Sequence, residues 1–368
     1  MKRREFLLSS IAGLLVGTNQ MTAQSRKGDP FEEACKLIQE QVDAGILESA
    51  TLHVHKGRNS QLRAFGNAQS GDAIFLIASI TKPMTATGLM VLVDRGELKL
   101  SDRVVKFIPE FSGEDRKDIT IQHLLTHTSG LPDQLPENDE LRKRHAPLAE
   151  FVARAVKTPL LFKPGTAYKY QSMGFLLAAE VAQRITNQPF AAFLSKEVYE
   201  PLGMKKSAVD LGPFKLTETV RSQTEFAAPE SGSGSVEAKD WDWNSPYWRN
   251  LGAPWGGAHS TAPDIAKFLR SFLNPDSKVL KESTARKMIQ DHNQGLDRRR
   301  GLGFDLGTNS FGEHCSGSTF GHGGSTGTLA WADPKTDRSF VILTSLPARK
   351  SRDLILNPVS DLVSSLDG

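Results

Sequence analysis

The chain has 368 residues, with 45 Lys and Arg against 42 Asp and Glu and a formal net charge of +3. This length predicts roughly two domains, or one domain built from two packed lobes, and leaves enough material for a buried site. Because acidic and basic residues nearly balance, the composition provides no basic surface of the kind that nucleic-acid binding needs. We therefore expect no nucleic-acid partner.

The first residues have the pattern of an export signal. A basic segment precedes a short apolar stretch, and small residues up to Ala23 provide a cleavage point. The adjacent Arg3 and Arg4 resemble a twin-arginine signal. We expect residues 1–23 to be removed and the mature chain, residues 24–368, to be periplasmic or otherwise exported, without a stable membrane span. An uncleaved anchor is the alternative, although the apolar run is much shorter than the ~20 residues of a span.

The two cysteines, Cys35 and Cys315, would meet an oxidising compartment after export, which permits a disulfide without requiring one. Cys35 shares a helical stripe with Phe31, Ile38 and Val42, which favours a buried thiol. Whether the two cysteines pair stays open. Their spacing fits no metal site, and we expect neither a metal nor another cofactor.

A helix is predicted over about residues 30–44, because Asp29 and Pro30 provide a start signal and Gly45 a stop. Alternating apolar residues then predict strands near residues 50–55 and 62–65. His53 and His55 fall on the polar side of this alternation, so they are expected to face solvent.

The middle of the chain is predicted to be mostly helical, from Ser79 to about residue 203. Regular patterns disappear over about residues 206–255, a stretch that contains the flexible segment 231–235 and four of the five Trp residues. This long loop is expected to form either a lid over a site or a plug under a sheet, and both interpretations remain open.

The last part of the chain predicts a helix over about residues 263–272, several strands and a final helix. The strands are expected near residues 302–306, 317–322, 328–332 and 340–344, with the turn 333–337 joining the last two. Strands at both ends of the chain and helices between them predict an α/β (α+β) fold, with one sheet-bearing lobe and an inserted helical lobe. We place the sheet lobe at about 28–80 and 256–368 and the helical lobe at about 81–255, with a site in the cleft between them.

Ser79 and Lys82 are the first candidates for chemistry. An apolar run leads into Ser79, which is expected to open a helix, so backbone N–H groups and the positive helix end would point at its hydroxyl. The spacing of three places Lys82 on the same helical face, where its amine can assist ionisation of the hydroxyl. The alternative is a helix-capping serine beside a solvated lysine.

Two further groups can complete a site. Tyr170 and Ser172 precede a predicted helix, and Tyr170 can shuttle a proton if Lys82 holds it close to deprotonation; the alternative is a packing aromatic. His322, Gly324 and Ser325 lie on a late, glycine-rich strand. Small residues there let a substrate approach the strand edge, and the Ser325 N–H can face an oxyanion while His322 lines the same wall.

These three groups, in this order, resemble the S-x-x-K, Y-x-N and [KH]-x-G motifs of the serine β-lactamase and D-alanyl-D-alanine peptidase superfamily, and the Tyr and His forms resemble its class C and esterase branch. Supporting stretches lie at 124–132, 201–204 and 256–264. The resemblance implies a β-lactamase/transpeptidase-like fold, an antiparallel sheet flanked by helices plus an all-helical lobe. It also implies a serine hydrolase that forms an acyl-enzyme and cleaves an ester or amide bond of a small molecule or peptide.

Carried over by position, the resemblance makes Ser79 the nucleophile and Lys82 and Tyr170 the general-base pair. The N–H groups of Ser79 and Ser325 would form the oxyanion hole, and His322, Gly324 and Ser172 would contact substrate. The sequence departs from the family at Ser172, where the motif has Asn, and this weakens the case for β-lactam or peptide recognition more than the case for acylation. His127, in the family-like loop, is expected to be structural.

The sequence allows two rival interpretations. Residues 323–327 also match G-x-S-x-G, the nucleophile elbow of α/β-hydrolases. An elbow needs a helix after the Ser and a His later in the chain. Here a strand hairpin is predicted after Ser325, and no His follows His322. A non-turnover, penicillin-binding-like sensor or scaffold is the other alternative, and only Ser172 supports it. Esterase, D-peptidase and β-lactamase activities share one acylation apparatus, so the substrate stays open, as does the oligomeric state. We favour an esterase or a peptidase.

Overall fold

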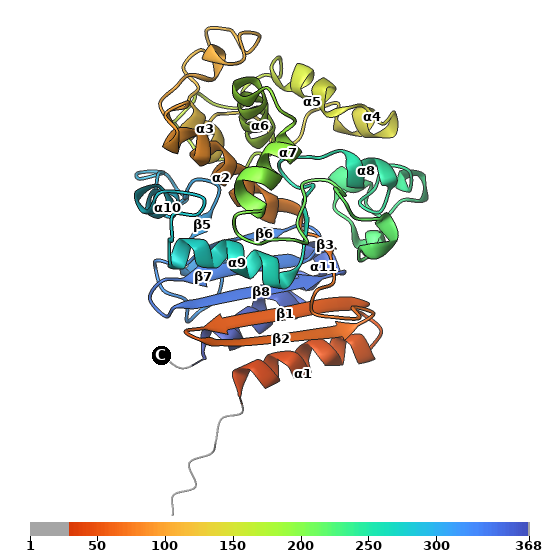
Figure 1. Ribbon diagram of the computed structural model, residues 1–368. Coiled ribbons are helices and arrows are strands. Elements are labelled where there is room, and N and C mark those ends of the chain that lie inside the picture. Colours follow the sequence, from red (N-terminus) through yellow and green to blue (C-terminus); the bar gives the residue numbers. More distant parts are fainter. Residues whose placement is uncertain (1–28, 367–368) are drawn as a thin grey trace, which may run out of the picture.

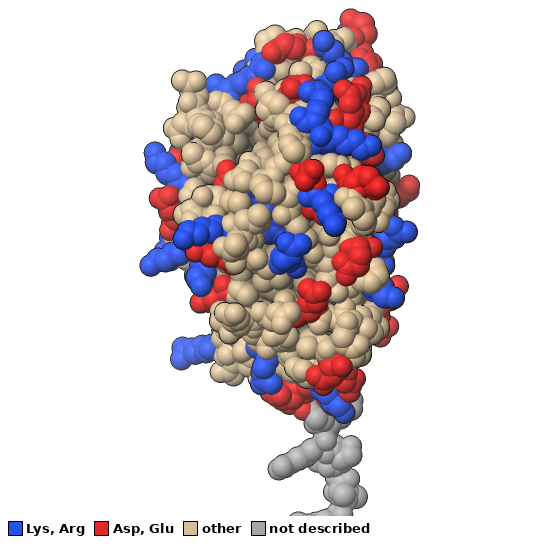
Figure 2. All heavy atoms as spheres, turned by 90° about the vertical axis from the view of Figure 1, so that its right-hand side faces the viewer, with Lys and Arg blue, Asp and Glu red and all other residues tan. Residues whose placement is uncertain are grey.

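The structure is a computed structural model that describes residues 29–366. The predicted export signal therefore lies outside the described residues. Among residues 29–366, no helix is both long and apolar enough to cross a bilayer. On the face shown in Figure 2, acidic and basic side chains are interspersed, in agreement with the near balance of charge.

An antiparallel six-stranded sheet lies at the centre of the lower half of the molecule (Figure 1), with the strand order β2-β1-β8-β7-β6-β5. Strand β1 from the start of the chain pairs with β8 from its end, with Leu52 opposite Ile342. The two ends of the chain thus build one sheet, as the sequence predicts. The strands are β1 (Ser49–Lys56), β2 (Asn59–Gly66), β5 (Asp305–Leu306), β6 (Phe320–Gly324), β7 (Thr328–Asp333) and β8 (Arg338–Thr344).

Helices cover both faces of this sheet because alternate strand residues enter two different cores. Ala50, Leu52 and Ile342 face α1 (Pro30–Asp43) and α12 (Asn357–Ser364), while Val341 and Leu343 belong to the core on the other side. That other side is covered by α9 (Ala262–Leu273), seen above the sheet in Figure 1. The mixed fold with an antiparallel sheet flanked by helices is confirmed.

Helices fill the middle of the chain, above the sheet in Figure 1. The central one, α2, is buried from Thr81 to Leu92, so it is apolar all round rather than amphipathic. The bounds are α2 (Thr81–Asp94), α3 (Ile121–Leu125), α4 (Asn138–Lys143), α5 (Leu148–Ala155), α6 (Met173–Thr186), α7 (Phe190–Leu194) and α8 (Pro246–Asn250); α10 (Glu282–Met288) and α11 (Ala348–Ser351) follow later. The division into two lobes near residues 80 and 256 stays a prediction. A single hydrophobic core contains both Leu89 of the predicted helical lobe and Val341 of the predicted sheet lobe.

The bounds of two strands and the burial of His53 differ from the expectations. Strand β5 has two residues rather than five, and β6 begins at Phe320 because a turn closes from Thr319 N–H to Ser316 O. His53 is buried rather than solvent-facing, because α9 covers that face of β1, and its Nε2 lies 2.9 Å from Ser60 Oγ. The buried thiol predicted for Cys35 is confirmed: both cysteines are free and buried, and burial raises the pKa of Cys35 to about 11.

Candidate active site

The turn that carries Ser79 is held in place by contacts from distant parts of the chain. Ser79 lies in a short 3₁₀ turn, Ala78–Ile80, directly before α2, and Ala78 has a left-handed backbone with φ +44°. The hydroxyls of Thr326 and Thr328 donate to Leu76 O and Ile77 O, at 2.7 and 3.1 Å. The β6–β7 hairpin therefore fixes where the Ser79 hydroxyl stands.

Lys82 follows Ser79 by one helical turn and is fully buried. Its Nζ lies 3.1 Å from Ser79 Oγ and 2.9 Å from the carbonyl oxygen of Trp255. Burial lowers the pKa of Lys82 to about 7, although Asp133 opposes this effect. At neutral pH a large fraction of Lys82 is thus a free amine, which can accept a proton from the Ser79 hydroxyl.

Tyr170 completes the group around the Ser79 hydroxyl, with which it forms a hydrogen bond. Lys82 Nζ lies 4.7 Å from the centre of the Tyr170 ring, and the buried ring of His127 stacks on it at 4.6 Å. Burial raises the pKa of Tyr170, so its hydroxyl stays protonated. Lys82 therefore does not hold Tyr170 close to deprotonation, the condition predicted from the sequence for a proton shuttle, because burial favours the neutral forms of both groups.

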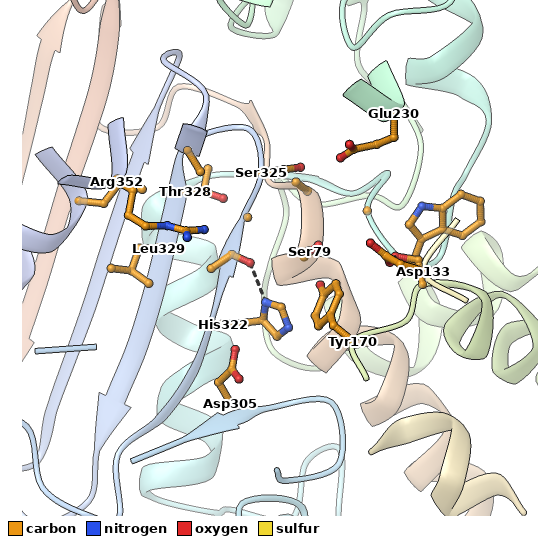
Figure 3. Close-up of a pocket in the computed structure, with 18 of the residues that line it drawn as sticks. Ser79, Asp133, Tyr170, Glu230, Asp305, His322, Ser325, Thr328, Leu329 and Arg352 are labelled. Atoms are coloured by element: carbon orange, nitrogen blue, oxygen red, sulfur yellow. Dashed lines mark hydrogen bonds between the residues drawn. The ribbon is translucent and has the colours of Figure 1, made fainter. Parts of the chain in front are cut away.

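His322 lies on β6 and is one of the residues that line the cavity (Figure 3). Its Nδ1 is 2.6 Å from Gly323 O and must carry the proton, since a carbonyl oxygen only accepts. Its Nε2 has no hydrogen-bond partner among the described residues, and the residue is only 4% exposed. Burial lowers the pKa of His322 to about 3, with Asp305 opposing, so the ring is neutral and Nε2 is an acceptor.

Ser325 directly follows β6 and lies beside Ser79 at the cavity (Figure 3), where the sequence predicts an oxyanion donor. A tight hairpin into β7 follows it, with Gly324 opposite Thr328, and no helix begins there. The geometry of a nucleophile elbow is therefore absent from the G-x-S-x-G stretch.

Gly324 is required because β6 passes very close to the turn before Ser79. A Cβ on Gly324 would overlap Thr328 Oγ1 and lie 2.5 Å from Ile77 O. We expect Gly324→Ala to lower the free energy of unfolding by about 1–3 kcal/mol. At Gly323, by contrast, a Cβ would lie 3.7 Å from its nearest neighbours, an ordinary contact. Denaturant unfolding of both variants tests this, and equal stabilities would contradict the account.

Ser172 stands at the start of α6 and is nearly fully buried. Its hydroxyl donates to Asp133 Oδ1 at 2.6 Å. Asp133 was not predicted as a site residue, and nothing in its local pattern distinguishes it from a loop aspartate after Pro132. The hydroxyl that replaces the family's Asn thus holds a carboxylate at the cavity.

The cavity over Ser79 has a volume of about 530 Å³ and is lined by residues from both parts of the fold. Trp243, Trp248 and Trp255 form part of its wall and are each at most 4% exposed. The Trp-rich segment thus forms a packed wall of the cavity, rather than a lid over it or a plug under the sheet. Figure 3 shows Asp133 and Glu230 on one side of the cavity and Arg352 on the other.

A buried polar network supports His127 and His322 from behind. Arg300 is fully buried, pairs with Asp305 and places one guanidinium nitrogen 2.8 Å from His127 Nε2. The other ring nitrogen of His127 faces the backbone N–H of Gln171 at 3.1 Å. The sequence did not single out Arg300 or Asp305. His127 contacts Tyr170 and the loop around it, as a positioning residue would. No group of three His, Cys, Asp or Glu side chains within the described part of the chain could hold a metal ion.

The family is shown by comparison with known proteins. A family model described as "Beta-lactamase" matches residues 35–363, nearly all of the described chain. The chain therefore belongs to the β-lactamase family.

Relatives of this chain are named after several different activities. "Esterase EstB" of Burkholderia gladioli is 37% identical over 158 residues, a match that covers 39% of this chain and 40% of that esterase. A "Putative D-alanyl-D-alanine carboxypeptidase" of Salmonella agona is 26% identical, over 87% of this chain and 84% of the relative. The relatives are thus esterases and peptidases by name.

Solved structures agree with the fold. "EstCE1, a hydrolase with promiscuous acyltransferase activity" has a TM-score of 0.72 at 19% identity and covers 91% of this chain and 98% of its own. The D-amino acid amidase from Ochrobactrum anthropi SV3 has a TM-score of 0.70 at 23% identity and covers 91% of this chain and 97% of its own. At these identities the likeness concerns the fold.

Proposed function

We propose that this chain is an exported serine hydrolase that cleaves an ester or amide bond through an acyl-enzyme on Ser79. The observation that carries the proposal is the 3.1 Å contact between Ser79 Oγ and the fully buried amine of Lys82, whose pKa is lowered to about 7. A buried neutral amine beside a hydroxyl is a general base at neutral pH, and a serine with such a base is an activated nucleophile.

In the acylation step, Lys82 accepts the proton of Ser79 as Oγ attacks the substrate carbonyl carbon. The negative charge that develops on the carbonyl oxygen is stabilised by the backbone N–H groups of Ser79 and Ser325. The protonated Lys82 and the neutral hydroxyl of Tyr170 then pass a proton to the leaving oxygen or nitrogen, and the bond to the leaving group breaks. The leaving group departs as an alcohol or amine, and the acyl group remains on Ser79.

Deacylation repeats these roles with water. A water molecule loses a proton to Lys82, either directly or through Tyr170, and its oxygen attacks the acyl carbon. The proton returns to Ser79 Oγ as the ester bond breaks, and the acid is released. The neutral ring of His322 lines the cavity in which these steps take place.

The expected result with a p-nitrophenyl propionate reporter is a rapid burst of p-nitrophenol followed by steady turnover. A burst equal to the enzyme concentration reports a covalent intermediate that forms faster than it hydrolyses. A burst without later turnover would instead support the sensor or scaffold alternative. Absence of both burst and turnover, across esters, D-amino-acid peptides and a cephalosporin reporter, would contradict the proposal.

A further inference from the structure

We infer that Asp133, held by Ser172, forms a subsite for a protonated amine on the acyl side of the substrate, so that this hydrolase prefers amino-acyl esters or amides. This inference rests on the proposed function, since it names the substrate class of the same site. The ligand class is an acyl group with an ammonium next to the scissile carbonyl.

The first support is the state of the Asp133 carboxylate. Its Oδ1 accepts the neutral hydroxyl of Ser172 at 2.6 Å, and within residues 29–366 the carboxylate takes part in no salt bridge. A charged group on the wall of a cavity is stabilised by a nearby group of opposite charge. Because no protein cation within residues 29–366 lies within salt-bridge distance of this carboxylate, a ligand cation can take that position.

The second support is the position of Asp133 relative to the reacting atoms. Asp133 lines the cavity together with Ser79 and Tyr170 (Figure 3). Among charged neighbours, it has the largest effect on the pKa of both Lys82 and Tyr170. A carboxylate on the wall of the cavity that contains Ser79 can meet a group on the α-carbon of the acyl moiety.

The other charged groups at the cavity are Glu230, Arg142 and Arg352, among others. Glu230 lies on the same side as Asp133, but the buried guanidinium of Arg142 lies near it and partly offsets its charge. Arg142 itself is held by Ser231 and stacks 4.0 Å from the centre of the Trp248 ring. Arg352 is on the opposite side (Figure 3), so it does not neutralise Asp133. Asp133 rather than Glu230 is therefore the partner for a ligand ammonium.

The test compares two reporter esters that differ at one group. Glycine p-nitrophenyl ester carries an ammonium where propionate p-nitrophenyl ester carries a methyl group, and neither is chiral. At a pH where the glycyl amine is protonated, kcat/KM is measured for both esters, each corrected for spontaneous hydrolysis. We expect Asp133→Asn, which preserves a partner for Ser172, to lower the glycyl-to-propionyl ratio of kcat/KM about tenfold to a hundredfold.

Two other variants make the test specific. Ser172→Ala removes the hydroxyl that orients the carboxylate and is expected to lower the same ratio by a smaller factor, which keeps the inference testable if Asp133→Asn does not fold. Glu114→Gln removes an exposed carboxylate that pairs with Lys117 at the surface, and it should leave the ratio as in the wild type.

Failure of the amine subsite and failure of the proposed function give different results in this experiment. If the wild type hydrolyses propionate ester and the ratio is the same in Asp133→Asn, the amine subsite is overturned while the proposed function stands. If the wild type hydrolyses neither ester and Ser79 accepts no acyl group, the proposed function and the subsite both fail.

Discussion

Replacing Ser79 with alanine is expected to lower kcat/KM for a reporter ester by at least about a thousandfold. The reason is that Ser79 Oγ is the atom that forms the bond to the acyl group, and neither Lys82 nor Tyr170 can replace it in that role. The side chain is only half-buried, so the substitution should change the unfolding temperature little. Steady-state kinetics and thermal unfolding of the same preparation measure both effects.

Ser325→Ala is the matched control for this experiment. It removes the only other serine hydroxyl with a hydrolase-like sequence context, yet it keeps the backbone N–H that is proposed to face the oxyanion. The p-nitrophenol burst should persist in Ser325→Ala and vanish in Ser79→Ala. The reverse pattern would contradict the assignment of the nucleophile and favour the G-x-S-x-G interpretation.

Lys82→Met is expected to lower kcat/KM by about 10²- to 10⁴-fold, the range for loss of a general base. Methionine has a similar shape and no ionisable group, so it removes the base without leaving a buried charge. The unfolding temperature should therefore not fall. A variant that loses activity and also unfolds at a much lower temperature would mean that Lys82 acts mainly in folding.

The pH profile gives the same residue a second test. In the wild type, kcat/KM should rise with pH and level off above about 7, because only the unprotonated amine of Lys82 accepts the Ser79 proton. His322 cannot cause this rise, since burial lowers its pKa to about 3, and burial lowers the pKa of His127 well below its usual value as well. The rise near pH 7 should disappear from the residual activity of Lys82→Met, and its persistence would point to another base.

Local patterns were sufficient to predict much of the fold. The first helix begins at Pro30 with Asp29 accepting the N–H of Phe31, as its capping signal predicts. The hairpin of β7 and β8 and the pairing of the two chain ends in one sheet follow from alternation and turn residues. What alternation could not predict is the burial of His53, because it depends on α9, more than 200 residues away in the chain.

The motif residues of the candidate site could be predicted from the sequence. The distant residues that contact them could not. Ser79 and Lys82 are three residues apart, so helical geometry alone brings them together. Asp133 meets Ser172 across 39 residues, and Arg300 meets His127 across 173, and no local rule predicts either contact. The protonation states of Lys82 and Tyr170 likewise follow from burial, which is a property of the folded molecule.

Peptide mapping of the wild-type protein after reaction with a fluorophosphonate tests the central claim most directly. The account predicts one modified peptide, with the phosphonyl group on Ser79, and no modification in Ser79→Ala. A label on Ser325 or on any other residue, or an unlabelled Ser79 in a folded protein, would contradict it.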